Sequence, residues 1–435
     1  MPSSPLTADA TQPTAHAEAG PAPVSSPEPI RHSTAELLVC LPALAPDALP
    51  SAFEAIASAF PTEPILVACA APPPDTSAFP TLELIPYTSA RSDVGWFLAA
   101  GDYSAAAQLA LQHNARAVIL LGGDTGAAST PNTLDPTLLR SFVDCMRGKN
   151  IDLVLPRFAL GPNDALVNSA LLYPLSRALF GADIRFPLPI DAAISGRLAQ
   201  RLVSSTQRLM ALNQGSSLLW PVAEAAAAGF TIAEVPAGPR ALPPPDATDL
   251  NTLLAQVAGS LFADIDAKAS FWQRARLAYT PRSSASSSAQ NHTGAGPGQT
   301  PPEAPDIQPM LDSFRLAYTN LHEIWSLVLP PNSLLGLKKL SLMPPAAFRM
   351  PDALWARIVY DFILAYRLRT INRGHLLGAL TPLYLAWVAS HLLLTSGVGA
   401  ETMAPEKHIE TLAAAFEADK PYLVSRWRWP DRFNP

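Results

Sequence analysis

Three sequence patterns are missing, and each absence excludes a class of protein. No Gly-x-Gly-x-x-Gly follows the first apolar strand pattern, so the dinucleotide-binding fingerprint is absent. No Gly-x-x-x-x-Gly-Lys-Ser/Thr occurs, which excludes a P-loop. No basic stretch would follow a nucleic-acid backbone, and the formal net charge is -6. We therefore expect no nucleic-acid partner.

Cysteine and charge are scarce. Cys40, Cys69 and Cys145 are an odd number without metal-ligand spacing, and each lies in or beside an apolar segment. We predict buried free thiols in a reducing compartment, and hence a cytoplasmic protein. Charged residues make up 15% of the chain and hydrophobic residues 49%, which predicts a large core walled by Ala-rich helices.

One long apolar run, residues 376–400, has nearly the length of a bilayer span. It contains Pro382, His391, two Thr and two Ser, and no second span accompanies it. We predict no transmembrane span here, but a buried helix hairpin of a globular domain.

The chain divides into four parts by composition. Residues 1–33 lack a basic start and an apolar core, so we expect a disordered tail and no signal peptide. Residues 34–277 alternate strand and helix patterns, and residues 278–308 read as a disordered linker or loop. Residues 309–435 show helical periodicity alone, which predicts a helical C-terminal domain.

The alternation in the second part predicts an α/β fold. Strand patterns such as ELLVCLP, PILVACA, RAVILLGGD and NIDLVLPRF are joined through helix patterns such as DALPSAFEAIASAF and GDYSAAAQLALQHNA. Such β-α-β order gives a parallel sheet that binds ligands at the carboxyl ends of its strands.

Helical spacing in the last part is regular. Residues 352–373 and 406–420 predict amphipathic helices on either side of the long apolar run. A further helix is predicted from apolar residues three and four positions apart, which are Leu311, Phe314, Tyr318, Leu321, Trp325 and Val328.

The stretch VILLGGDTGAAS, residues 118–129, resembles a buried strand that surfaces at a pocket rim. Asp124 is then a metal ligand beside a sugar-nucleotide, half of an aspartic-protease dyad, or a turn residue that binds its own backbone. The protease alternative fails because the chain has one Asp-Thr-Gly copy among helical patterns. The other two alternatives stay open.

The stretch YPLSRALFGADIRFPLPIDAAISGRLA, residues 173–199, resembles GT-A glycosyltransferases of the mannosylglycerate synthase and glucosyl-3-phosphoglycerate synthase group. The order of the surrounding segments, about residues 37–427, fits the same group. The family pattern is matched at Tyr173, Pro174, Leu175, Arg177, Ala178, Leu179, Gly181, Arg185, Pro187, Asp191 and Ser195.

The resemblance implies a bacterial GT-A fold: a Rossmann-like, mostly parallel sheet flanked by helices, with a helical C-terminal region. It implies transfer of a hexose from a UDP- or GDP-linked donor to a small acceptor, with an acidic, glycerate-like molecule as the candidate. A homodimer is compatible with it. The alternative is a catalytically impaired GT-A-like binding or regulatory protein.

The resemblance also implies roles for single residues. Asp191 is the catalytic candidate, facing the acceptor hydroxyl or the sugar; it otherwise caps the next helix. Arg157 and Asp164 are candidates for the acceptor. Arg157 and Arg185 either bind anions through forked hydrogen bonds or form structural ion pairs. The donor candidates are Pro42, Gly123, Asp124 and Arg185.

The metal-binding pattern of the family is incomplete in this sequence. Its Asp-x-Asp motif reads Gly122-Gly123-Asp124, and the position of its metal-binding His reads Leu242. Asp124 is therefore the single metal candidate, and we predict that Mg²⁺ or Mn²⁺ binds weakly. Cationic side chains and the backbone N–H groups of the Gly-rich turn would then balance the negative charge of the diphosphate.

Overall fold

The computed structural model describes residues 35–42, 44, 48–70, 77–88, 97–122, 134–161, 163–211, 217–240, 249–274, 306–396 and 403–429. The predicted N-terminal tail and most of the predicted linker lie outside these residues. So do Gly123, Asp124 and Leu242. The domain boundaries predicted from composition stay predictions.

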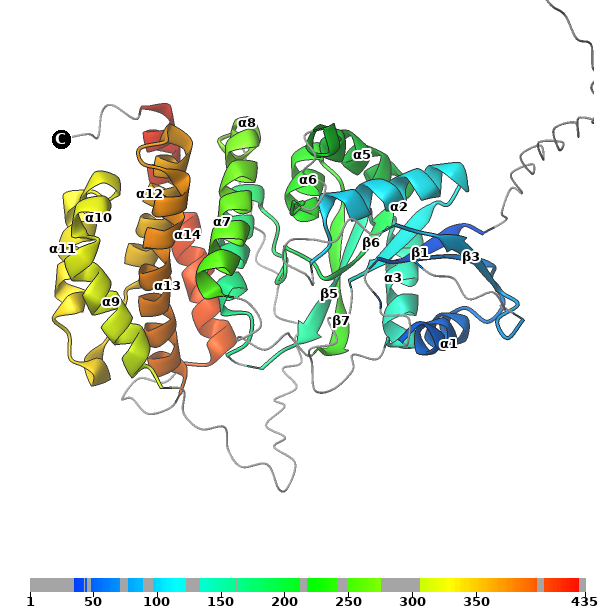
Figure 1. Ribbon diagram of the computed structural model, residues 1–435, viewed down its shortest axis with the longest axis horizontal. Coiled ribbons are helices and arrows are strands. Elements are labelled where there is room, and N and C mark those ends of the chain that lie inside the picture. Colours follow the sequence, from blue (N-terminus) through cyan, green and yellow to red (C-terminus); the bar gives the residue numbers. More distant parts are fainter. Residues whose placement is uncertain are drawn as a thin grey trace, which may run out of the picture. The chain divides into compact units, whose positions relative to one another are not determined.

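Within the described residues, seven strands form one mixed sheet in the order β3-β2-β1-β4-β6-β5-β7 (Figure 1). Only β6 runs antiparallel to its neighbours, β4 and β5; every other pair in this sheet is parallel. The strands are β1 (Leu37–Leu41), β2 (Ile65–Cys69), β3 (Leu82–Pro86), β4 (Ala117–Leu121), β5 (Leu153–Ala159), β6 (Asp191–Ser195) and β7 (Ile232–Pro239).

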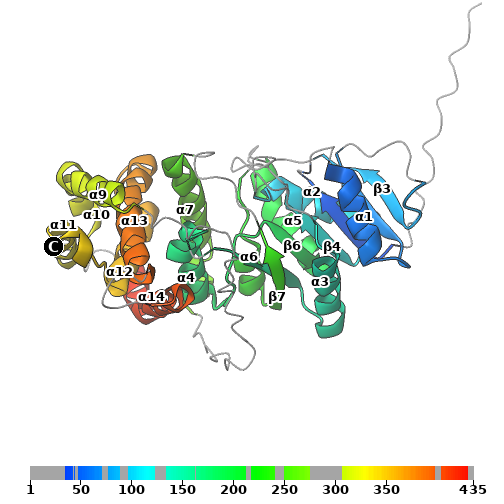
Figure 2. The same cartoon turned by 90° about the horizontal axis from the view of Figure 1, so that it is seen from below.

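Helices cover both faces of the sheet because successive side chains of the buried strands point to opposite sides. Leu38 and Leu120 belong to the core on one face, whereas Val39 and Ile119 belong to the core on the other face. Helices α1 (Leu49–Ala59) and α3 (Pro136–Lys149) cover the second face (Figure 2). The first face carries α2 (Ala100–Gln112), α5 (Gly196–Ala211) and α6 (Pro221–Ala228).

A helical segment from Asn168 to Phe180 follows β5. It consists of a π-turn at Asn168–Leu172, α4 (Tyr173–Leu175) and a second π-turn at Ser176–Phe180. Gly181 ends it with a φ of 67°, a conformation that glycine adopts at little cost. Such π-turns accommodate Pro174 inside a helix, where it cannot donate a backbone hydrogen bond.

The remaining described elements are helical. They are α7 (Leu250–Ala267), α8 (Ala269–Trp272), α9 (Gln308–Asn320), α10 (His322–Val328), α11 (Pro331–Ser341), α12 (Asp352–Leu368), α13 (Arg373–Thr395) and α14 (Pro405–Arg428). The fold class predicted from the sequence is therefore confirmed: a mostly parallel α/β sheet flanked by helices, with a helical C-terminal region.

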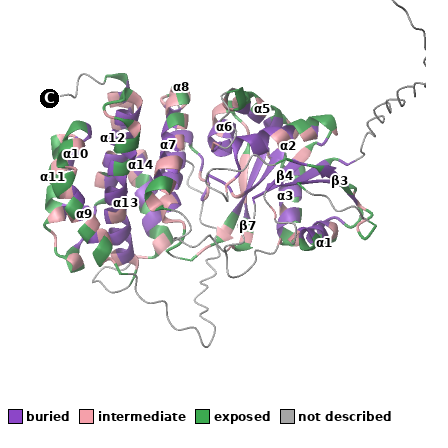
Figure 3. Ribbon diagram, viewed as in Figure 1, coloured by how far each residue is buried: buried purple, intermediate pink, exposed green. Residues whose placement is uncertain are grey.

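Two helix predictions need correction. Helix α13 is a single helix that runs through Pro382, so the predicted hairpin is wrong. In the described part of the chain it alone is long and apolar enough to cross a membrane, and 78% of its most apolar window is buried (Figure 3). The helix predicted from Leu311 to Val328 is two helices, α9 and α10, which meet at Leu321.

The C-terminal helices pack against the helical segment that follows β5. Trp355 of α12 donates its indole N–H to the carbonyl of Ala170 at 2.9 Å. Arg177 pairs with Glu417 of α14 at 2.8 Å.

The three cysteines are buried and free, as predicted.

Candidate functional site

The candidate site begins where β4 ends. The backbone N–H of Gly122 lies 3.0 Å from the carbonyl oxygen of Ile190 and 2.9 Å from Oδ1 of Asp191, and both oxygens accept from it. A Cβ atom at position 122 would lie 2.4 Å from that carbonyl oxygen, so the approach requires glycine. The glycine seen in the sequence thus brings the start of β6 against the end of β4.

Asp191 forms an ion pair with Arg240 at this edge. The Oδ2 atom of Asp191 lies 3.3 Å from Nη1 of Arg240, and the two side chains are 2% and 14% exposed. Arg240 also donates to the carbonyl of Gly122 and lies over the ring of Phe158. Burial raises the pKa of Asp191, while Arg240 and the Gly122 N–H act in the opposite direction.

The position of Asp191 settles one sequence alternative. It is the first residue of β6 and pairs with Leu121, whereas the next helix, α5, begins at Gly196. The helix-capping alternative is therefore wrong. Arg240, its partner, is not among the residues singled out from the sequence; the available signal is an arginine two positions after the stretch IAEVPAG, residues 232–238.

The predicted donor residues map onto the same edge. Pro42 directly follows β1, and the β1–β4 register, which pairs Cys40 with Leu120, puts it level with Gly122. Pro42 is buried. Gly123 and Asp124 follow Gly122 in the chain but lie outside the described residues. The donor role of all three stays a prediction.

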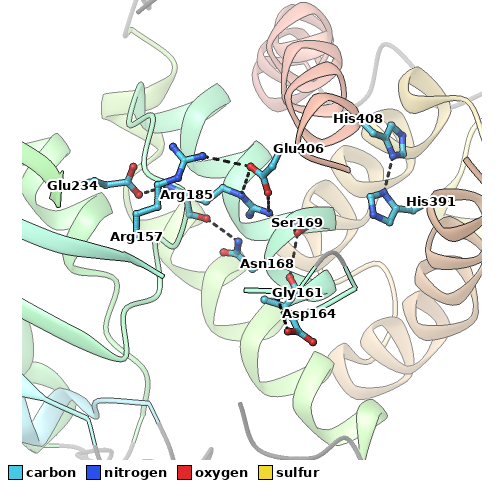
Figure 4. A network of polar contacts seen from close by, with 11 residues as sticks. Arg157, Gly161, Asp164, Asn168, Ser169, Arg185, Glu234, His391, Glu406 and His408 are labelled. Atoms are coloured by element: carbon cyan, nitrogen blue, oxygen red, sulfur yellow. Dashed lines mark hydrogen bonds and ion pairs between the residues drawn. The ribbon is translucent and has the colours of Figure 1, made fainter. Parts of the chain in front are cut away.

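Arg157 and Arg185 meet at Glu406 of α14 (Figure 4). Nη2 of Arg185 lies 3.1 Å from one carboxylate oxygen, and Nη2 of Arg157 lies 3.5 Å from the other. The Arg185 side chain is 9% exposed and also donates to Ser169 Oγ at 3.0 Å. Within the described residues, no hydrogen bond or ion pair joins either arginine to Asp191.

Asp164 holds a turn after β5 (Figure 4). Its Oδ2 accepts the N–H of Gly161 at 2.9 Å, and its own N–H donates to the carbonyl of Gly161 at 3.1 Å. The side chain is exposed, and the neighbouring Asn163 and Ala165 line a cleft. Whether Asp164 contacts an acceptor stays a prediction.

This cleft has a volume of about 360 Å³ and adjoins the Asp191–Arg240 pair through Ile190 and Phe158. It opens beside the part of β5 that extends beyond its pairing with β6, since the two strands pair only at Leu153 and Val154 of β5. Pro156 follows and has no N–H to continue that pairing. Helices α7, α9 and α13 contribute further lining residues. The sequence did not predict the cleft, because its walls come from segments far apart in the chain.

The described residues do not fit a divalent metal. Among them, no three His, Cys, Asp or Glu side chains come together. Both carboxylate oxygens of Asp191 are already engaged, one by Gly122 and one by Arg240. A metal ion needs several free oxygen ligands, so we derive no chemical step through a metal here.

No protein-family model and no curated protein matches the chain. Among solved structures, it resembles glucosyl-3-phosphoglycerate synthase from Mycobacterium tuberculosis in complex with Mn²⁺, UDP-glucose and phosphoglyceric acid, with 17% identity and a TM-score of 0.34 over 54% of this chain and 80% of that one. Another structure of that enzyme is 18% identical over 54% and 82% of the two chains, with a TM-score of 0.32. A mycobacterial protein is 15% identical over 55% and 76%, with a TM-score of 0.32. The named enzyme belongs to the group that residues 173–199 resemble, but similarity this low supports no conclusion about activity or ligands.

Proposed function

We propose that the protein is a glycosyltransferase that moves a sugar from a UDP- or GDP-linked donor to an acceptor hydroxyl. The observation that carries the proposal is the buried Asp191–Arg240 pair at the carboxyl edge of the sheet, beside the Gly122 turn. In open α/β sheets, ligands bind outside the carboxyl ends of the strands. The family pattern that includes Asp191 supports the same reaction class.

In this proposal Asp191 is the general base of the transfer. The acceptor oxygen would bond to the anomeric carbon while the bond from that carbon to the diphosphate breaks. The electron pair leaves with the diphosphate, and the hydroxyl proton passes to Asp191. Burial raises the pKa of this carboxyl, which makes it a stronger base than an exposed aspartate.

Arg240 would supply positive charge for the leaving diphosphate. A guanidinium has five N–H donors, and two hydrogen bonds, to Asp191 and to Gly122, leave donors for a phosphate. Pro42, Gly123 and Asp124 would complete the donor site, with Asp124 as the one metal candidate. Because Asp124 is the one carboxylate left of the family's metal-binding motif in the sequence, we expect donor binding to depend only weakly on Mg²⁺ or Mn²⁺.

The acidic acceptor implied by the resemblance would bind through Arg157, which is 52% exposed, and near Asp164. Glu406 already neutralises Arg157 and Arg185, so such an acid would have to displace it. Adding glycerate or phosphoglycerate to the transfer assay tests this acceptor directly.

Calorimetric titration with UDP-glucose, UDP-galactose and GDP-mannose tests the proposal. Each titration is run once in EDTA and once with Mn²⁺. We expect one donor to bind in both conditions with similar affinity. Binding that EDTA abolishes would refute the weak metal dependence, and binding of none of the donors in either condition would refute the glycosyltransferase proposal.

A further inference from the structure

We propose that the cleft beside Asp191 binds an unbranched alkyl or acyl chain of about ten to twelve carbons. The chain would be the apolar part of the acceptor, and its hydroxyl end would reach Asp191. This inference rests on the proposed function, names the acceptor class of the same site and differs from the small acidic acceptor that the resemblance implies.

The chemistry of the lining favours an apolar ligand. None of the described lining residues is Asp, Glu, Lys, Arg or His. Of the two asparagines there, Asn168 donates its amide to the carbonyl of Arg185 at 2.7 Å and is already engaged. A small acid would lose its hydration against these walls without gaining a charged partner. Methylene groups that leave water for these walls lower the free energy of binding.

The size of the cleft sets the chain length. A volume of about 360 Å³ lies within the range of small-molecule sites. At roughly 30 Å³ for a group the size of a water molecule, which is close to the size of a methylene, about twelve groups fill it.

One side of the cleft adjoins the Asp191–Arg240 pair, although neither residue is among its described lining residues. On that side Phe158 lines the cleft, and the guanidinium of Arg240, which pairs with Asp191, lies over the Phe158 ring. The apolar wall is formed by helices α7 and α13, with Val257 and Val388 among its residues. A ligand with one hydroxyl and one apolar chain matches this division, because the charges of Asp191 and Arg240 cancel and favour a neutral head group.

Tyr384 also lines the cleft, and its side chain is 5% exposed. A bound chain that carries an oxygen beside it would accept a hydrogen bond from the Tyr384 hydroxyl.

A series of straight-chain alcohols from butanol to tetradecanol tests the inference by calorimetry on the full chain. We expect affinity to rise about fourfold per added methylene and to level off at about ten to twelve carbons, where the cleft is full. Affinity that does not depend on chain length, or no binding of any alcohol, would overturn the inference.

A filled cleft provides the matched comparison. Leu385 of α13 is partly exposed in the cleft, so Leu385→Trp adds volume there, whereas Leu393→Trp adds the same volume on the same helix outside it. We expect decanol binding to weaken at least tenfold in the first variant and less than twofold in the second. Equal effects would overturn the inference. If Leu385→Trp does not fold, Leu253→Trp fills the cleft from α7.

Titration of UDP-glucose and GDP-mannose into the same variants separates the two proposals. We expect donor binding to be unchanged in Leu385→Trp. If the alcohols bind as expected but no nucleotide-sugar does, the glycosyltransferase proposal fails while the apolar ligand site stands. If a nucleotide-sugar binds and no alcohol does, the inference alone fails.

Discussion

Arg240 and Asp191 pair at 3.3 Å across 49 positions of sequence. The pair lies where the end of β4, the start of β6 and the end of β7 come together. Truncation of Arg240 would leave a buried carboxylate without its cation. We expect Arg240→Met to lower the free energy of unfolding by about 3–5 kcal/mol, measured by urea denaturation.

The double variant Asp191→Asn/Arg240→Met is the control for this loss, because it removes both charges. It should recover most of the lost stability. A single Arg240→Met variant within about 0.5 kcal/mol of the wild type would contradict the pairing energy that the burial implies.

Gly122 should not tolerate a side chain. A Cβ atom there would lie 2.4 Å from the backbone oxygen of Ile190, and backbone cannot give way as a flexible side chain does. We expect Gly122→Ala to cost at least about 2 kcal/mol of stability and to lower donor affinity, because it moves Asp191. The control is Gly148→Ala in α3, where no atom lies within 4 Å and alanine should stabilise the helix by up to about 1 kcal/mol. Similar denaturation midpoints for the two variants would rule out a tight contact at Gly122.

Glu406 determines whether the guanidinium of Arg185 can bind the diphosphate of a nucleotide. The Nη1 atom of Arg185 is buried without a hydrogen-bond partner among the described residues, and Glu406 neutralises the side chain. We expect Glu406→Gln to lower stability by about 1–3 kcal/mol. It should also raise nucleotide affinity several-fold, because a freed guanidinium attracts the diphosphate more strongly.

The control for Glu406→Gln is Glu410→Gln, which changes an exposed residue on the same helix. Both quantities should stay within error of the wild type in that variant. Unchanged nucleotide affinity in Glu406→Gln would limit Arg185 to a structural ion pair.

Stability should fall as pH rises through neutrality because of Asp361. Burial raises the pKa of this carboxyl to about 7, although Tyr422 and Arg426 donate to it. A carboxyl whose pKa is higher in the folded than in the unfolded state stabilises the fold fully below about pH 4 and loses that contribution as pH rises through about 7. Asp361→Asn keeps an acceptor oxygen and removes the titration.

Thermal unfolding of the wild type and Asp361→Asn between pH 5 and 8 measures this effect. We expect the variant to lose less stability than the wild type over that range, by roughly 2–4 kcal/mol. Parallel profiles would mean that Asp361 stays charged in the folded protein throughout.

The sequence predicts the elements whose residues repeat a long pattern. Strands β1, β2 and β4 are continuous apolar runs, and α12 and α14 show several turns of helical spacing. Strand β6 escapes prediction because it has only five residues, begins with a carboxylate and leads directly into α5. The break between α9 and α10 cannot be predicted from the sequence, because the helical spacing of apolar residues continues through Leu321.

The site is predicted less completely than the fold, because its contacts join distant residues. Asp191 stands out as a lone carboxylate in an apolar stretch, but nothing near it in the sequence indicates Arg240 as its partner. The bond between Arg185 and Glu406 spans 221 positions. Only the folded chain shows that this predicted anion ligand already has a carboxylate.

The central claim is that Asp191 is the base of a sugar transfer, and nucleotide release tests it most directly. Turnover of the donor identified by titration is measured for the wild type, Asp191→Asn and Asp152→Asn. Asp152 is a buried carboxylate bonded to Ser195, at the opposite end of β6, and to Arg197, so its variant matches the first in kind. We predict that Asp191→Asn lowers kcat at least about 100-fold while donor affinity stays within about threefold, and that Asp152→Asn keeps kcat within about threefold. Wild-type turnover in Asp191→Asn, or an equal loss in Asp152→Asn, would contradict the account.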